Sequence, residues 1–169
     1  MEPISADVIE KTLQRMDEMT ASDVKALMDL MGKEQPYVLA YLLSVGGDSL
    51  NPDERELLIY LGTVIWQIMR QSSGLFSPDG SIRQISAETL DKFEEKNWKM
   101  LEYLQDEPEA DFEDTVEKIF KNYPQPEVLR YVIESLMAES EEAEDYFIRD
   151  ENIGIMAIYL KTIIDCFNE

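Results

Sequence analysis

The sequence predicts an all-α fold of about eight helices, on three observations. Leu, Glu, Met, Lys and Ala are abundant, only 7 of the 169 residues are glycine, and β-branched residues show almost no alternation. Apolar residues recur at steps of three and four, which gives each segment one apolar face. Short motifs of capping residues, proline and glycine separate these segments, so we expect helix nearly throughout.

Helix starts and stops divide the first part of the chain into three short helices. Capping side chains accept the unpaired N–H groups of a first turn, proline fits that turn, and glycine adopts the left-handed conformation that ends a helix. The signals in chain order are an N-cap at Ser5, an N-cap at Thr20 or Ser22, a stop near Gly32, a first-turn Pro36 and a stop at Gly46-Gly47.

The strongest helix start in the chain follows at residues 51–54. Asn51 suits the N-cap, Pro52 suits the first turn, and Asp53 and Glu54 complement the positive end of the helix dipole. The helix predicted over about 52–71 is apolar around much of its circumference. We therefore expect it to lie at the centre of the fold.

A turn at Ser77-Pro78-Asp79-Gly80 separates this half from a second set of four helices. Each of these is again marked by a cap, a proline or an apolar stripe. In chain order, Ser86 caps the first helix, Asp106-Glu107-Pro108 interrupts it, residues 112–120 mark the second, Pro126 begins the third and Asn152 caps the last.

The two sets of helices share sequence. Residues 4–11 match 85–92, residues 35–41 match 125–131, and residues 59–65 match 158–164, at offsets of 81, 90 and 99. Because the matches keep their order, we interpret 1–80 and 81–169 as two copies of a four-helix unit in one compact domain with a shared core, packed as a bundle or a short α-solenoid.

Four matched tyrosines are the first candidates for a paired site: Tyr41 with Tyr131, and Tyr60 with Tyr159. They are the matched aromatics that carry a polar tip. The simpler interpretation is that their hydroxyls satisfy buried backbone groups.

The charge excludes several classes of function. With a formal net charge of −21 and no histidine, the chain is a poor candidate for a direct grip on DNA or RNA. The lack of histidine also excludes Ser-His-Asp and Cys-His triads, imidazole ligands for zinc and Glu-x-x-His di-iron sites. Without a Gly-rich phosphate loop, Cys-x-x-Cys motif or calcium loop, we expect no cofactor.

Cysteine usage and hydropathy favour a cytoplasmic protein. The single cysteine, Cys166, lies in an apolar run and is expected to be a buried thiol. Residues 1–5 show no signal-peptide pattern. The longest apolar stretch, from Leu57 to Met69, is too short to span a bilayer, so no membrane association is expected.

Negative charge concentrates in the second half. Residues 1–80 hold 13 acidic and 6 basic residues, whereas residues 81–169 hold 23 and 9. We therefore favour a non-enzymatic interaction module that docks a basic protein partner, such as a toxin or nucleic-acid-binding protein. The residues expected to bind it are Glu139, Glu141, Glu142, Glu144 and Asp145. A solvated, self-repelling surface is the simpler interpretation.

Two other hypotheses stay open. A magnesium-dependent, all-helical nucleotide hydrolase would use carboxylates three residues apart, because that spacing places both on one helix face. Its metal ligands would be Asp91, Glu94, Asp111 and Asp114. The third hypothesis is a purely structural homo-oligomer.

Overall fold

The computed structural model describes residues 1–71, 73–141 and 147–169. In these ranges the regular structure consists of eight α-helices and two short 3-10 turns, with one isolated β-bridge between Phe76 and Ile82. The all-α prediction is therefore confirmed. Only the backbone is described at Ser73, Glu109, Ala110, Phe112, Glu113, Glu139, Ser140 and Glu141.

The first three helices are α1 (Ala6–Asp17), α2 (Ala21–Glu34) and α3 (Pro36–Ser44). Thr20 caps α2, because its hydroxyl accepts the Asp23 N–H at 3.2 Å while the Asp23 carboxylate accepts the Thr20 N–H at 2.9 Å. Helix α2 continues two residues past the expected stop at Gly32. A glycine inside a helix costs only about 1 kcal/mol, and it is Pro36 that opens the next helix.

After α3 the chain turns through two left-handed glycines, Gly46 (φ 82°) and Gly47 (φ 46°), as predicted. A short 3-10 turn (Gly47–Ser49) then leads to α4 (Pro52–Arg70). Asn51 and Glu54 form the reciprocal cap expected from the sequence, with both N–H···O distances at 2.8 Å. Helix α4 is central: the side chains of Leu58, Ile65 and Trp66 are fully buried.

The second 3-10 turn (Ser73–Leu75) and the turn at Gly80 (φ 82°) join the halves. The remaining helices are α5 (Ala87–Asp106), α6 (Glu109–Asn122), α7 (Pro126–Glu141) and α8 (Asp150–Asn168). The prediction that Asn152 caps α8 is wrong, because the helix starts two residues earlier with Arg149 at the N-cap. The Asn152 amide instead donates to the carbonyl of Ser49 at 3.0 Å and to Glu54 at 2.9 Å.

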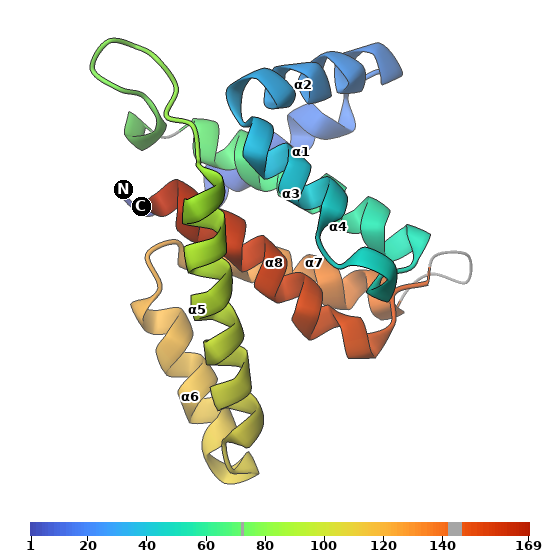
Figure 1. Cartoon of the computed structure of the whole chain (residues 1–169), viewed down its shortest axis with the longest axis vertical. Coiled ribbons are helices and arrows are strands. Elements are labelled where there is room, and N and C mark those ends of the chain that lie inside the picture. Colours follow the sequence, from blue (N-terminus) through green and yellow to red (C-terminus); the bar gives the residue numbers. More distant parts are fainter. Residues whose placement is uncertain (72, 142–146) are drawn as a thin grey trace.

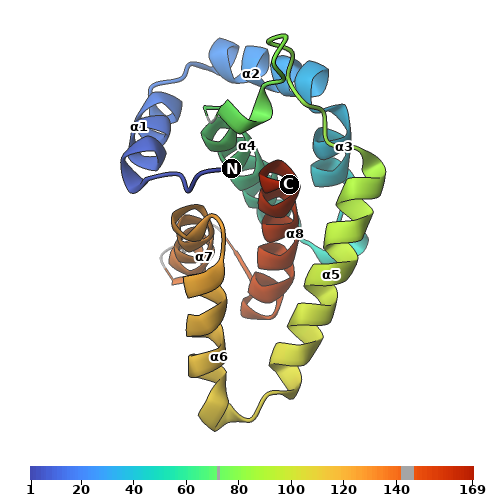
Figure 2. The same cartoon turned by 90° about the vertical axis from the view of Figure 1, so that its left-hand side faces the viewer.

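Helices α4 and α8 lie side by side and run in the same general direction through the centre of the molecule (Figures 1 and 2). Helix α1 packs on α4, and α5 and α7 pack on α8. One apolar core joins both halves, with Trp66 of α4 and Phe167 of α8 both fully buried. The far ends of α5 and α6 extend away from this core as a hairpin (Figure 1).

Cys166 lies in the core, as the sequence predicts. Burial raises the pKa of its thiol to about 12, and the nearby carboxylate of Asp165 contributes to the same shift. The thiol therefore stays protonated and unreactive at neutral pH.

Candidate functional site

Two charged side chains, Lys161 and Asp165, lie in the mainly apolar inner face of α8. Lys161 and Asp165 are four residues apart, so they share one helix face, and their side chains are only 10% and 11% exposed. Lys161 Nζ lies 2.7 Å from Asp165 Oδ2. Because charges are seldom buried without a role, this pair is the first place to look for a site.

Three polar side chains complete a cluster around this pair. Asn97 of α5 donates from Nδ2 to Asp165 Oδ2 (2.9 Å) and Thr162 Oγ1 (3.1 Å), and its Oδ1 accepts from Lys161 Nζ (2.8 Å). The Tyr123 hydroxyl donates to Asp165 Oδ1 at 2.6 Å, and Lys161 Nζ lies 4.8 Å from the centre of its ring. We call Asn97, Tyr123, Lys161, Thr162 and Asp165 the α8 polar cluster.

The α8 polar cluster is closed on itself. Both carboxylate oxygens of Asp165 accept hydrogen bonds, and the Lys161 ammonium has two acceptors and a ring face. Burial raises the pKa of Tyr123, and the negative charge of Asp165 raises it further, so this phenol remains a donor at neutral pH. A nucleophilic lysine must be uncharged and must reach a substrate. Lys161 is instead enclosed by its partners, so the cluster is better suited to holding α5 and Tyr123 against α8.

The matched tyrosines meet across the two halves. The rings of Tyr41 and Tyr159 lie 6.2 Å apart at an interplanar angle of 83°. Burial raises the pKa of Tyr131 to about 12, and Tyr60 lies close enough to add to this shift. The structure thus brings Tyr41 together with Tyr159, and Tyr60 together with Tyr131.

A tryptophan that the sequence analysis did not single out joins the first pair. The ring of Trp98 on α5 lies 5.9 Å from that of Tyr159, at 79°, and its indole N–H donates to Glu94 at 3.2 Å. The buried Tyr41 hydroxyl has no hydrogen-bond partner among the described residues. Burial raises its pKa, and the charge of Glu94 raises it further. We call Tyr41, Trp98 and Tyr159 the aromatic corner.

Two buried glutamines exchange hydrogen bonds between the halves. Gln35 Oε1 accepts the Ile85 N–H at 3.0 Å, and its Nε2 donates to the carbonyl of Arg83 at 2.8 Å. Gln125 Oε1 accepts the Ile4 N–H at 2.9 Å, and its Nε2 donates to the carbonyl of Glu2 at 3.1 Å. Each half therefore holds the segment that precedes the first helix of the other.

A buried ion pair joins the starts of α4 and α8. Glu54 has no exposed surface and accepts from Arg149 at 2.8 Å (Nη2), 3.0 Å (Nε) and 2.9 Å (backbone N–H). Burial alone would raise the pKa of Glu54. The hydrogen bonds from Arg149, Asn51 and Asn152 outweigh burial and hold the pKa at about 2.

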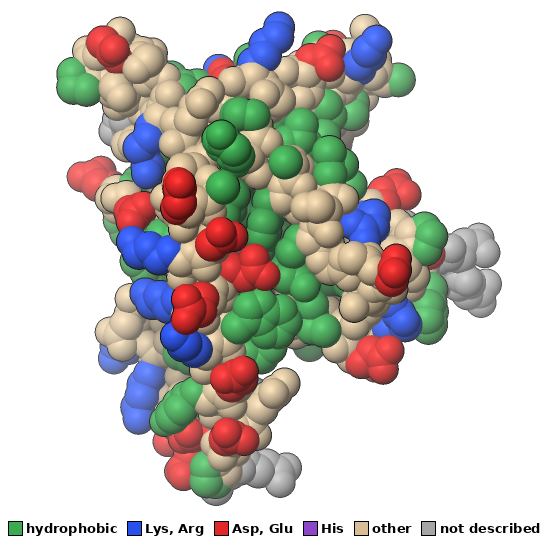
Figure 3. Space-filling view, viewed as in Figure 1, with side chains coloured by type: hydrophobic (Ala, Val, Ile, Leu, Met, Phe, Trp, Pro, Cys, Tyr) green, Lys and Arg blue, Asp and Glu red, His purple; other side chains and the backbone are tan. Residues whose placement is uncertain are grey.

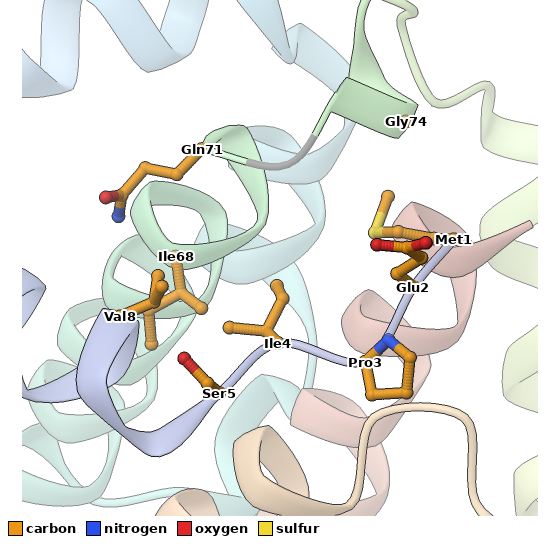
Figure 4. Close-up of a pocket in the computed structure, with 9 residues that line it drawn as sticks. All are labelled: Met1, Glu2, Pro3, Ile4, Ser5, Val8, Ile68, Gln71 and Gly74. Carbon is orange, nitrogen blue, oxygen red and sulfur yellow. The ribbon is translucent and has the colours of Figure 1, made fainter.

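One cavity, of about 320 Å³, lies between the N-terminal segment and the end of α4 (Figure 4). Of the nine described residues that line it, Glu2 alone carries a charged side chain, so this cavity offers no set of catalytic groups. Another cavity, of about 270 Å³, lies between α1 and α7, and its lining includes Arg130, Tyr131 and three glutamates, Glu10, Glu127 and Glu134.

The residues predicted to bind a basic partner cannot be placed. Glu142, Glu144 and Asp145 lie outside the described residues, as do the side chains of Glu139 and Glu141. Their role stays a prediction.

The predicted metal ligands form two separate pairs, one near the start of α5 and one near the start of α6. Asp91 and Glu94 lie in the first two turns of α5, whereas Asp111 and Asp114 lie at the start of α6. Twelve residues of helix separate Glu94 from the end of α5, which is about 18 Å at 1.5 Å per residue. No group of three or more Asp, Glu or Cys side chains that could hold a metal occurs in the described ranges.

None of the described helices is both long and apolar enough to cross a membrane. No protein-family model, curated protein or solved structure matches this chain.

Proposed function

We propose that this chain is a non-enzymatic protein-binding module whose acidic second half docks a basic protein surface. The observation that carries the proposal is the α5–α6 hairpin, which extends from the core with its acids exposed (Figure 1). Residues 100–117 contain eight Asp and Glu and no Lys or Arg. The exposed members with described side chains are Glu102, Asp106, Asp111, Asp114 and Glu117.

Physical chemistry supports this use of the hairpin. Like charges on a projecting element create a strong local potential, which steers an oppositely charged partner and speeds its association. The α8 polar cluster, where a catalytic lysine would be sought, has its donors and acceptors occupied by one another. That closure favours binding over catalysis.

Neutralising the hairpin tests the proposal. The test variant carries Asp106→Asn, Asp111→Asn, Asp114→Asn and Glu117→Gln. The matched control neutralises four exposed acids of the first half through Glu18→Gln, Asp29→Asn, Asp48→Asn and Glu56→Gln. We expect basic proteins to co-purify from native lysate with the wild type and the control but not with the test variant, as quantified by mass spectrometry.

A second variant, with Glu139, Glu141, Glu142 and Glu144 changed to Gln, tests the acids that the sequence predicted to bind the partner. If both this variant and the hairpin variant retained every partner of the wild type, the docking proposal would be wrong.

We also infer that residues 1–80 and 81–169 are two copies of one unit, related by a pseudo-twofold axis between α4 and α8. The reciprocal bonds of Gln35 and Gln125 support this relation, because each copy gives the other the same contact. The starts of α4 and α8 repeat the exchange: Asn51 donates to the carbonyl of Phe147, and Arg149 to that of Ser49. Asn51 and Arg149 are the N-cap residues of their helices, and each acceptor lies two residues before the other cap. A solenoid stack would not produce reciprocal contacts.

A cytoplasmic location is part of the same proposal. Its support is the single cysteine, which is buried and leaves no intrachain disulfide to form. The partner is proposed to be a basic protein. The alternative is that the chain associates with itself, which light scattering would detect as an oligomer.

A further inference from the structure

A groove lies between α3 and α5, with α8 beneath it. Figure 3 shows apolar side chains along this hollow and acidic side chains along its α5 edge. The aromatic corner belongs to these three helices, since Tyr41 comes from α3, Trp98 from α5 and Tyr159 from α8. The groove is therefore apolar at its floor and negative at one edge.

The aromatic corner offers two partly exposed rings, those of Tyr41 and Trp98, whereas Tyr159, which contacts both, is buried. The ring of Tyr159 stands at 83° to that of Tyr41 and at 79° to that of Trp98, so it meets each of them edge to face. The face of an aromatic ring carries partial negative charge and attracts an ammonium or guanidinium group. The carboxylate of Glu94 is held beside the corner by the Trp98 indole N–H at 3.2 Å.

The charges of α5 are divided between two faces. Asp91, Glu94, Trp98 and Glu102 follow one another at steps of three and four, so they form one stripe along the helix. Because Trp98 belongs to the aromatic corner, this acidic stripe borders the groove.

The lysines of α5 occupy a different face and are already engaged. Lys92 pairs with Glu169 and Lys99 with Glu95, each at 2.6 Å, and Lys96 lies 5.8 Å from the centre of the Phe93 ring. Each of them therefore has a partner outside the acidic stripe, although Lys99 also attracts Glu102 of the stripe.

We propose that this groove receives a basic segment of the protein partner and that the aromatic corner binds a lysine or arginine side chain of that segment beside Glu94. The inference rests on the proposed function, because it names where a basic partner is held. An occupant that is only apolar would leave the acidic stripe desolvated and unpaired. A cationic side chain on an extended segment can pair with the carboxylates of the stripe and contact the rings of the aromatic corner at the same time.

Tryptophan fluorescence tests the inference with a decalysine peptide as probe. Of the two tryptophans, Trp66 is fully buried in the core, so a change in emission on adding the peptide reports Trp98. We expect the peptide to shift the emission of the wild type. Titration calorimetry at low salt then gives the affinity of each variant.

The variants distinguish the contribution of the Trp98 ring to peptide binding from that of the Glu94 charge and from any loss of folding. Trp98→Leu should weaken binding about fivefold, the ratio that corresponds to one exposed cation–π contact, and Trp98→Phe should restore most of the loss. Glu94→Gln should weaken binding more than Glu10→Gln, which removes an equal charge from an exposed position of α1. Circular dichroism and thermal melting confirm that each variant is folded.

The outcomes distinguish the inference from the proposed function. If the hairpin variant loses the peptide while Trp98→Leu and Glu94→Gln bind it like the wild type, the groove inference is overturned and docking through the hairpin stands. If decalysine does not bind the wild type at all, both fail. If tetramethylammonium shifts Trp98 emission while decalysine does not, the corner is a small-molecule site and the inference is again overturned.

Discussion

Glu54 makes one contact that the sequence predicts and another that it does not. Its place three residues after Asn51 predicts the capping interaction, which the structure confirms. Arg149, its ion-pair partner, comes from 95 residues further along the chain. No local pattern indicates such a contact, because it depends on how α4 and α8 pack.

We expect Glu54→Gln to destabilise the fold by about 2 kcal/mol, because Arg149 loses its buried anion and the new amide places donors against donors. Urea unfolding at pH 7 measures the loss. Glu56→Gln, on an exposed position of the same helix, should change stability by less than about 0.5 kcal/mol. Equal effects of the two substitutions would contradict the role assigned to Glu54.

The stability contributed by Glu54 should depend on pH. Its pKa in the folded state is about 2, below the ordinary value of 4.5. Protons therefore bind the unfolded state first, so the contribution is fully present above pH 4.5 and is lost as the pH falls toward 2. The difference in unfolding free energy between wild type and Glu54→Gln should shrink over this window. A difference that stayed constant from pH 6 to pH 2.5 would refute the assignment.

The sequence pattern is sufficient to indicate the pair Lys161 and Asp165, because two opposite charges four residues apart interrupt an apolar helix. What the sequence could not provide was their partners, Asn97 and Tyr123, which approach from α5 and from the α6–α7 connection. The sequence could not assign Trp98 to a site for the same reason, since its ring meets Tyr159 only through tertiary packing.

If the α8 polar cluster is structural, Lys161→Met should cost about 3 kcal/mol, because it leaves the Asp165 carboxylate buried without its cation. Adding Asp165→Leu should recover most of that loss, since a buried ion pair is often replaceable by apolar residues of similar size. Binding of the basic partner should be unchanged in the folded double variant. Loss of partner binding in that variant would give the cluster a direct functional role.

At the scale of helices, local signals were sufficient wherever a cap or proline stands beside an apolar stripe. They placed α3, α4 and α7 at their prolines, Pro36, Pro52 and Pro126. They failed at Asn152, where a good capping residue is used for contacts with Ser49 and Glu54 instead. A cap residue predicts a helix start only when no tertiary partner competes for its side chain.

Gln35 and Gln125 each satisfy two backbone groups of the other half, so we expect Gln35→Ala and Gln125→Ala to destabilise the protein by similar amounts, about 2 kcal/mol each. Gln105→Ala, on the exposed hairpin, is the matched control and should be nearly neutral. Thermal and urea unfolding provide the comparison. A large effect at one glutamine and none at the other would contradict the pseudo-twofold relation.

At the scale of the whole molecule, composition predicted the helical class, and the order of the residues showed that negative charge concentrates in the second half. Neither could predict that α5 and α6 would carry that charge outward on a hairpin, or that Tyr41, Trp98 and Tyr159 would meet beside it. These features depend on the packing of helices that are distant in sequence. The expectation of a basic partner therefore comes from the sequence, whereas the shape of the surface proposed to meet it comes from the structure.

The most direct test of a basic partner at the acidic hairpin is site-specific photo-crosslinking in native cells. A photoreactive residue at Gln105, exposed near the hairpin tip, is compared with one at Gln14, exposed on α1. We expect Gln105 to crosslink a protein with a strongly basic surface and Gln14 not to do so. Crosslinks from Gln105 only to acidic proteins, or the same products from both positions, would contradict the central claim.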